Sequence, residues 1–181
     1  MNTPKSYGKS IKSSDLGDGI ARFFPIASDV IPEPASPMAE GKEQVATSQG
    51  TGLPADVLLP ILESLREDVA EIRAALAEMH MRMVGGSLLI IYEADVERAR
   101  KGLEWMAEHR EDEDDEDEDD EDEESGKVHV GAPYLVKLID FAHTKIVPGI
   151  GPDEGVLKGV DTVLSLLDGR IGQVQVVVGS A

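Results

Sequence analysis

The most regular hydrophobic pattern of the chain lies in residues 55–83, where apolar positions recur at spacings that alternate between four and three. These positions are Leu58, Leu62, Leu65, Val69, Ile72, Leu76, Met79 and Met83. The spacing puts them on one face of a long helix. A coiled-coil dimer and a helix packed on the core of its own domain both fit this pattern. We favour the second, because the repeat barely reaches four heptads and leads directly into a predicted strand.

Two residues qualify this helix. Pro60 predicts either a kink or a helix that begins there, since proline has no N–H to donate. His80 stands at the expected helix end beside two methionines. We expect it to be a surface or capping residue rather than a ligand.

Two nearly continuous apolar runs, residues 87–93 and 135–144, predict strands that pair as an antiparallel ribbon. The second run contains a single carboxylate, Asp140. Burying a carboxylate is costly unless it is paired, hydrogen-bonded or bound to a metal. We therefore expect a buried strand whose Asp140 meets a cation where the strand emerges.

Shorter helices are predicted at residues 14–24, 96–109 and 152–167. In the first, Ser14 or Asp15 is the expected cap, and the expected buried stripe is Leu16, Ile20, Phe23 and Phe24. In the last, Asp153 is the expected N-cap and Gly169 the expected C-cap. The tail from Arg170 predicts an edge strand or disorder.

Residues 25–54 are rich in Pro, Ser, Gly and Thr, which predicts a loop or a disordered linker. Apolar residues make up 41% of the chain and aromatic residues only 4%, so the expected core is aliphatic. The chain has no cysteine, which excludes disulfides, thiolate metal sites and cysteine nucleophiles. With 181 residues it suits one domain, or one lobe with tails.

The net charge of −19 comes mostly from residues 111–124, an unbroken run of fourteen Asp and Glu, without which it would be −5. Like charges at this density predict a disordered loop over residues 108–127, inserted between the two strands. The charge opposes binding to nucleic acid, and we expect no direct binding of this kind. No apolar run approaches the length of a membrane span, and no signal peptide is apparent. A soluble protein of the cytoplasm, the nucleus or both is expected.

Five short motifs follow one another in an order that resembles the inositol polyphosphate kinases. They are Tyr7-Gly8-Lys9-Ser10, Gly19-Ile20-Ala21-Arg22-Phe23-Phe24, Gly86-Ser87-Leu88-Leu89, Ile139-Asp140-Phe141, and Asp153-Glu154-Gly155 followed by Lys158-Gly159-Val160-Asp161. The third and fourth are similar to the S-S-L-L and I-D-F motifs of that family, with Gly86 in place of the first serine.

The resemblance implies an α+β fold: the C-terminal lobe of the protein-kinase-like fold of that family, with an antiparallel ribbon and packed helices. Residues 1–24 would begin this lobe and residues 55–181 would form the rest. The implied activity is phosphorylation of an inositol phosphate by ATP with Mg²⁺. Asp140 would be the metal ligand, Ser87, Leu88 and Leu89 would bind ATP with it, and His143 is a further candidate for holding phosphate.

The P-x-x-x-D-x-K-x-G signature of the family, which supplies the acceptor-activating Asp and a phosphate-binding Lys, does not occur in these residues. A truncated or incomplete kinase, inactive alone, is therefore expected. The alternative is a catalytically inactive protein whose acidic run, residues 111–124, binds basic nuclear proteins.

Overall fold

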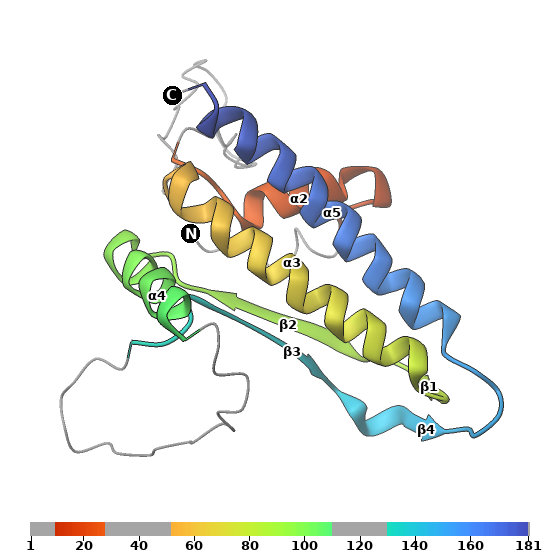
Figure 1. Cartoon of the computed structure of the whole chain (residues 1–181). Helices are drawn as coiled ribbons and strands as arrows, with labels where there is room; N and C mark the ends of the chain where they lie inside the picture. Colours follow the sequence, from red (N-terminus) through yellow and green to blue (C-terminus); the bar gives the residue numbers. More distant parts are fainter. Residues whose placement is uncertain (1–9, 28–51, 110–129, 181) are drawn as a thin grey trace, which may run out of the picture.

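The computed structural model describes residues 10–27, 52–109 and 130–180, which form a mixed arrangement of helices and two-stranded sheets (Figure 1). In chain order the elements are η1 (Ser13–Asp15), α2 (Leu16–Phe23), α3 (Ala55–Glu78), β1 (Met81–Met83), β2 (Ser87–Tyr92), α4 (Val96–Glu108), β3 (Tyr134–Ile139), η2 (Phe141–His143), β4 (Thr144–Ile146) and α5 (Glu154–Val178). The α+β class predicted for the chain is confirmed.

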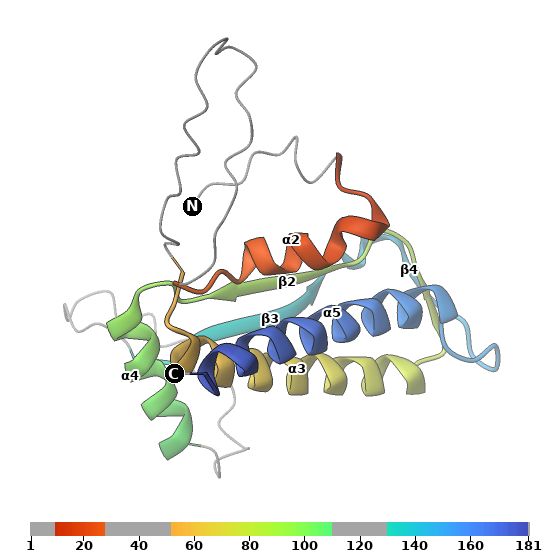
Figure 2. The same ribbon diagram turned by 90° about the horizontal axis from the view of Figure 1, so that it is seen from above.

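Helices α3 and α5 lie side by side and run in opposite directions, as Figures 1 and 2 show. Most of the predicted apolar stripe of α3 is buried, and with it Leu167 and Val174 of α5, whereas Met79, just past the helix, is 47% exposed. Exposed ion pairs flank this contact, from Arg66 to Asp168 at 2.8 Å and from Arg73 to Asp161 at 2.9 Å. Such exposed pairs contribute little, so the buried apolar surface holds the helices together. The preference for a helix packed on its own domain is confirmed.

The limits of α3 differ from the prediction. The helix begins at Ala55 and continues past Pro60, so the alternative that it begins at the proline is wrong. Because Pro60 has no N–H, only the carbonyl of Asp56 loses its hydrogen bond within the helix. Asp56 is an exposed residue of the first turn. At the other end α3 stops at Glu78, Met79 is extended, and Met83 belongs to strand β1.

Strands β2 and β3 pair antiparallel from Ser87 opposite Ile139 to Tyr92 opposite Tyr134, which confirms the predicted ribbon. The predicted strand over residues 135–144 is wrong in extent, because β3 ends at Ile139 and a 3₁₀ turn separates it from β4. Strand β4 pairs with β1, which the sequence analysis did not predict.

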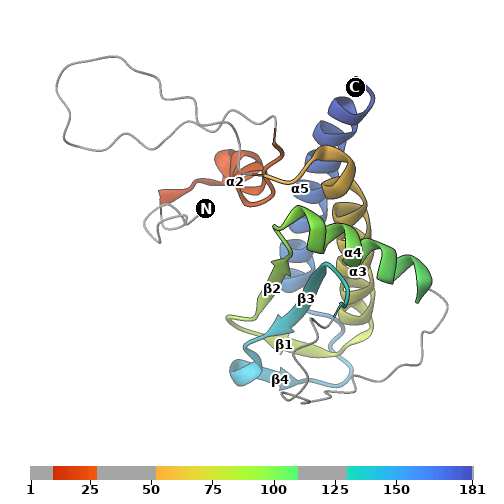
Figure 3. The same cartoon turned by 90° about the vertical axis from the view of Figure 1, so that its left-hand side faces the viewer.

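The two faces of the β2–β3 ribbon differ in burial. Leu88, Ile90, Tyr92, Tyr134, Val136 and Leu138 share the inner face and pack against the core. The other face carries Leu89, Ile91 and Leu135, with exposures of 38%, 52% and 40%. The prediction of a strand buried on both faces is therefore wrong, because helices cover the ribbon on one side (Figure 3).

The inner face of the ribbon is also tied to α3 by a hydrogen bond, which the Tyr134 hydroxyl donates to Oδ2 of Asp68 at 2.8 Å. Burial, followed by this bond, raises the pKa of Tyr134 above its usual value. Burial likewise raises the pKa of the Asp68 carboxyl. A partly buried polar pair of this kind helps to specify how the ribbon sits on the helix.

Helix α2 is fastened at its C-terminal end. The Phe24 carbonyl accepts hydrogen bonds from Nε and Nη2 of the buried Arg170, at 3.0 and 2.7 Å. The Tyr92 hydroxyl donates to the Phe23 carbonyl at 2.9 Å. Asp15 is the N-cap residue, as one of the two alternatives predicted, but its side chain makes no capping bond. Phe23 is 46% exposed, so its assignment to the buried stripe is wrong, whereas Phe24 is fully buried.

Helix α5 begins as predicted, because Oδ1 of Asp153 accepts hydrogen bonds from the N–H groups of Gly155 and Val156. The predicted end at Gly169 is wrong, and so is the prediction of an edge strand or disorder after Arg170. The helix continues to Val178 because Arg170 and Val174 extend its buried face. Gly169 lies on the exposed side.

Only the two ends of residues 25–54, the predicted loop or disordered linker, lie in the described part of the chain. Ile26 and Leu53 are buried and form a parallel bridge, which brings the two ends of the segment together. Residues 28–51 lie outside the described part of the chain, as do Tyr7-Gly8-Lys9 and the acidic run 111–124. Of the helices described, none combines the length and apolar character that crossing a membrane requires.

We expect Leu62→Ala to lower the free energy of unfolding by about 3 kcal/mol, because it leaves a cavity between α3 and its neighbours. Urea unfolding at two protein concentrations measures this. Glu67→Ala, on the exposed side of α3, is the matched control and should change little. An unfolding midpoint of the parent chain that rises with protein concentration would contradict intramolecular packing of this face and favour a coiled coil.

Asp153 links two elements, because its Oδ2 also accepts a hydrogen bond from the Met83 N–H at 3.1 Å. That bond, followed by those from α5, lowers the pKa of the carboxyl below its usual 3.8. The carboxylate therefore stabilises the fold fully above the unfolded-state pKa, and this contribution is lost as the pH falls through the lower folded-state pKa.

We expect Asp153→Ala to cost about 1–2 kcal/mol at pH 7, the range for a lost N-cap and a lost partner of a backbone N–H. The difference from the parent should shrink when unfolding is measured at pH 3. Asp153→Asn keeps a capping oxygen and should recover part of the loss at pH 7. A difference for Asp153→Ala that grows toward pH 3 would contradict the lowered pKa.

Candidate functional site

The register of the ribbon brings two of the sequence motifs together. Ser87 is opposite Ile139, so Asp140 lies one residue beyond the last pair of β2 and β3. The next pair along the ribbon is Met83 opposite Thr144. Between the two pairs lie residues 84–86 on one side and residues 140–143 on the other, and we call these seven residues the ribbon break. The side with residues 140–143 is one residue longer than the other, and the 3₁₀ turn η2 accommodates this extra residue.

Asp140 adopts the left-handed conformation at the ribbon break, with φ 69° and ψ 52°. It is the only non-glycine residue with positive φ in the part of the chain that the structure describes. Such outliers often mark functional positions, where the surrounding structure holds a less favourable backbone. Here the Val84 N–H bond to the His143 carbonyl, at 3.2 Å, closes the turn that contains Asp140.

The expected burial of Asp140 is wrong, because the residue is exposed. A cation is therefore not needed to offset desolvation, and the argument for a metal ligand reduces to position and chemistry. Within residues 10–27, 52–109 and 130–180 no group of three or more His, Asp or Glu side chains could hold a metal. A metal at Asp140 would need ligands from phosphates and water, which is how Mg²⁺ usually binds.

The other predicted site residues lie on different faces of the ribbon or in the turn η2. Ser87 and Leu89 lie on its outer, exposed face. Leu88 lies on the inner face and packs against the core, so it supports the ribbon from within. His143 lies in η2 with an exposed side chain, and its carbonyl closes the turn. The register thus puts Ser87 next to Asp140, whereas Leu89, opposite Lys137, lies farther along the outer face and Leu88 faces the core.

A hollow of about 510 Å³ separates the ribbon break from the start of α5. Gly85, Gly86 and Ser87 line one side, and Gly155 and Gly159 line the other. The Asp153-Glu154-Gly155 motif therefore faces the Gly86-Ser87 motif across this space. The carboxylate of Asp153 accepts hydrogen bonds from three backbone N–H groups, which makes Asp153 a structural residue rather than a metal ligand or a base.

Arg82 is a residue that the sequence analysis missed. Its Nη1 donates to the carbonyls of Gly151 and Pro152, at 2.8 and 3.1 Å, and its Nη2 donates to that of Ile150 at 3.2 Å. It therefore fixes the loop between β4 and α5, where Gly149 and Gly151 have positive φ. The only signal in the sequence was a lone arginine between two apolar residues of a predicted helix, and there it suggests an exposed side chain.

His80 holds the same loop from the other side. Its Nδ1 accepts a hydrogen bond from the Gly149 N–H at 2.7 Å, and its carbonyl accepts one from Val147. The prediction that His80 is a surface or capping residue agrees with this contact, although the residue caps a loop rather than a helix. Together His80 and Arg82 determine the approach of α5 to the ribbon break.

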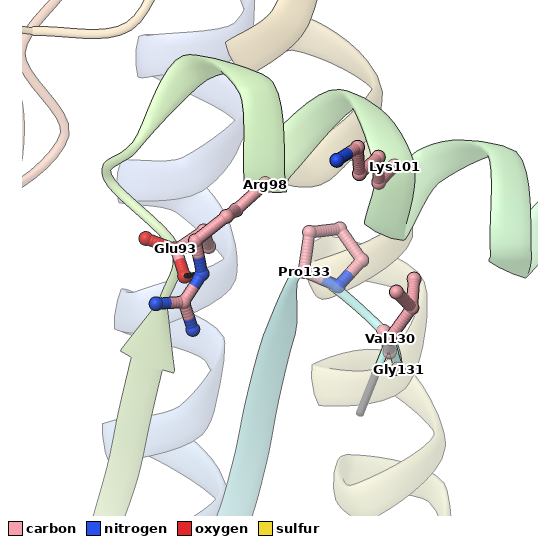
Figure 4. A pocket seen from close by; sticks show the side chains of 7 residues that line it. Glu93, Arg98, Lys101, Val130, Gly131 and Pro133 are labelled. Carbon is pink, nitrogen blue, oxygen red and sulfur yellow. Dashed lines mark ion pairs between the residues drawn. The ribbon is translucent and has the colours of Figure 1, made fainter. Parts of the chain in front are cut away.

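A second hollow, of about 390 Å³, lies at the far end of the ribbon (Figure 4). Arg98 and Lys101 of α4 and Pro133 line it, and Arg98 forms an ion pair with Glu93 at 2.8 Å. Glu93 directly follows β2, whereas Asp140 lies beside the start of that strand. The length of the ribbon thus separates this hollow from Asp140, and it is not part of the candidate site.

The conformation of Asp140 predicts how substitutions affect stability. We expect Asp140→Val to be less stable than Asp140→Gly by about 1–2 kcal/mol, because a β-branched side chain is disfavoured at positive φ and glycine is not. Urea unfolding of both variants measures the difference. At Lys137, an extended position of β3, the same pair of substitutions should favour valine. Equal stability of the two Asp140 variants would contradict the left-handed backbone.

Three comparisons with known proteins agree. The sequence model of the family described as inositol polyphosphate kinase matches residues 1–168. The inositol polyphosphate multikinase of Saccharomyces cerevisiae is 37% identical over 103 residues, covering 49% of this chain and 29% of that protein. A crystal structure of the S. cerevisiae inositol phosphate multikinase Ipk2 in complex with ADP and Mn²⁺ has a similar fold, with a TM-score of 0.54 and 22% identity.

That structural match covers 92% of this chain and 50% of the solved one. The chain therefore spans half or less of the length of the relatives it matches. The resemblance suggested by the five motifs is confirmed by the match of the family model to most of the sequence. On this evidence the chain belongs to the inositol polyphosphate kinase family.

Proposed function

We propose that this chain takes part in the ATP-dependent phosphorylation of an inositol phosphate and contributes the metal-binding carboxylate, Asp140. The observation that carries the proposal is the register of the ribbon. It sets Ser87 opposite Ile139, so that a hydroxyl and a carboxylate lie at the same open end of an exposed apolar face.

Phosphoryl transfer needs little covalent chemistry from the protein, and it depends on positioning and on neutralising the phosphate charge. A bound Mg²⁺ would supply that neutralisation. Asp140 is a suitable ligand, because carboxylate oxygens are the donors that Mg²⁺ prefers and the exposed position leaves room for phosphates and water. The Ser87 hydroxyl would donate a hydrogen bond to a phosphate oxygen.

The structure around Asp140 suits this role. A ligand must be held in place to be effective, and the paired strands on both sides of the ribbon break hold Asp140. The bond from Met83 to Asp153 and the contacts of Arg82 fasten the opposite strand to the loop before α5. We propose that these contacts keep the Asp140 carboxylate in place during turnover.

Because the chain spans half or less of its matched relatives, its share in the reaction is best tested by binding. The solved relative was crystallised with ADP and Mn²⁺, and the same pair serves as the probe. We expect this chain to bind ADP more tightly with Mn²⁺ or Mg²⁺ than with EDTA, measured by isothermal titration calorimetry.

Asp140→Asn should abolish the gain in ADP affinity that the metal provides, because the substitution removes the charge while keeping the shape of the side chain. Asp161→Asn, which removes an exposed carboxylate of α5, is the matched control and should keep the gain. If metal-dependent binding is equal in the parent chain and Asp140→Asn, Asp140 is not the metal ligand. If the parent chain binds no nucleotide at all, the proposed role in nucleotide binding is wrong.

A further inference from the structure

The outer face of the β2–β3 ribbon carries one charged side chain, Lys137. Along β3 its neighbours on this face are Leu135 and Ile139, and across the ribbon it is opposite Leu89. Lys137 is exposed and makes no hydrogen bond or ion pair with the residues that the structure describes. A lone cation is thus surrounded by apolar side chains on a surface that no described element covers.

The two ends of this outer face differ in chemistry. Ser87 and Asp140 lie at one end, and the pair Ile91 and Leu135 lies at the other. Lys137 is three residues before Asp140, a separation of about 10 Å at the usual rise of a strand. This is close to the distance between the β-phosphate and the purine of one nucleotide. A nucleotide whose metal-bound phosphates meet Asp140 would therefore extend its ribose and base over Lys137.

The side chains of the outer face suit a nucleoside that lies over Lys137. The apolar side chains, with exposures of 38% for Leu89 and 40% for Leu135, provide a surface on which a flat ring can be buried. Purine nitrogens and ribose hydroxyls accept hydrogen bonds, and a lysine ammonium offers three donors and no acceptor. A cation at this place also has no role in binding the metal, which would repel it.

We propose that Lys137 is a nucleotide-binding residue that donates a hydrogen bond to the base or ribose, while Asp140 and Ser87 face the phosphates. The inference rests on the proposed function and adds to it the residue that holds the other end of the nucleotide. Lys137 is a contact residue for the nucleoside part and takes no part in metal binding.

The test is calorimetric binding of three probes, each with Mn²⁺: ADP, adenosine and inorganic tripolyphosphate. Lys137→Met keeps the length of the side chain and removes the donor. We expect it to weaken the binding of ADP and adenosine about tenfold, as loss of a charged hydrogen bond does, and to leave tripolyphosphate unchanged. Lys137→Arg should retain ADP binding within about threefold, since it keeps a donor at the same place.

Lys158→Met is the matched control, because Lys158 is an exposed lysine on α5. It should leave the binding of all three probes unchanged. Lys137→Met that binds ADP as tightly as the parent chain would overturn the inference, since Lys137 would then be a charge that only keeps an exposed sheet face soluble. Equal weakening of ADP and tripolyphosphate would also overturn it, because the contact would be to phosphate.

The outcomes separate this inference from the proposed function. Metal-dependent ADP binding that requires Asp140 but not Lys137 overturns only the inference. Binding that requires Lys137 but not Asp140 supports the inference and overturns the assignment of the metal ligand. A parent chain that binds neither ADP nor adenosine overturns both.

Discussion

The alternation of side chains along the β2–β3 ribbon is the constraint on which the candidate site depends. Leu88, Leu138 and their inner-face neighbours must pack on the core, and a slip of one residue would exchange the two faces of a strand. The register is therefore specified by burial rather than by the site. Because the inner face is fixed in this way, Ser87 and Leu89 lie outward and the strand ends with Asp140 beside Ser87.

Much of this arrangement could be predicted from the sequence. The helical face of α3 follows from spacing, and the pairing of two apolar runs follows from their composition. The Asp153 cap follows from an acidic residue before a helical stripe. The helical face and the cap are local, because each depends on residues close together in the chain, and each strand is likewise recognised from its own apolar run. The family motifs added the expectation that Asp140 and Ser87 belong to one site.

The features that could not be predicted depend on contacts between distant residues. Helix α5 continues beyond Gly169 because Arg170 donates a hydrogen bond to the carbonyl of Phe24, a residue near the other end of the described chain. The sequence predicts a helix over the short strand β1 because Met79, just before the strand, and Met83, its last residue, continue the heptad spacing. The exposure of Asp140 likewise depends on the 3₁₀ turn, which an apolar run does not reveal.

The pairing of α3 with α5 has a consequence for how the chain acquires its structure during synthesis. Arg66 and Asp168 are 102 residues apart, and α5 leaves the ribosome after every other described element. Until then the part of α3 that packs on α5 has no permanent cover, and nascent chains with such surfaces attract chaperones and are prone to aggregate. The face of α3 that α5 covers therefore stays open until α5 has been made, whereas the ribbon can pack on α3 before then.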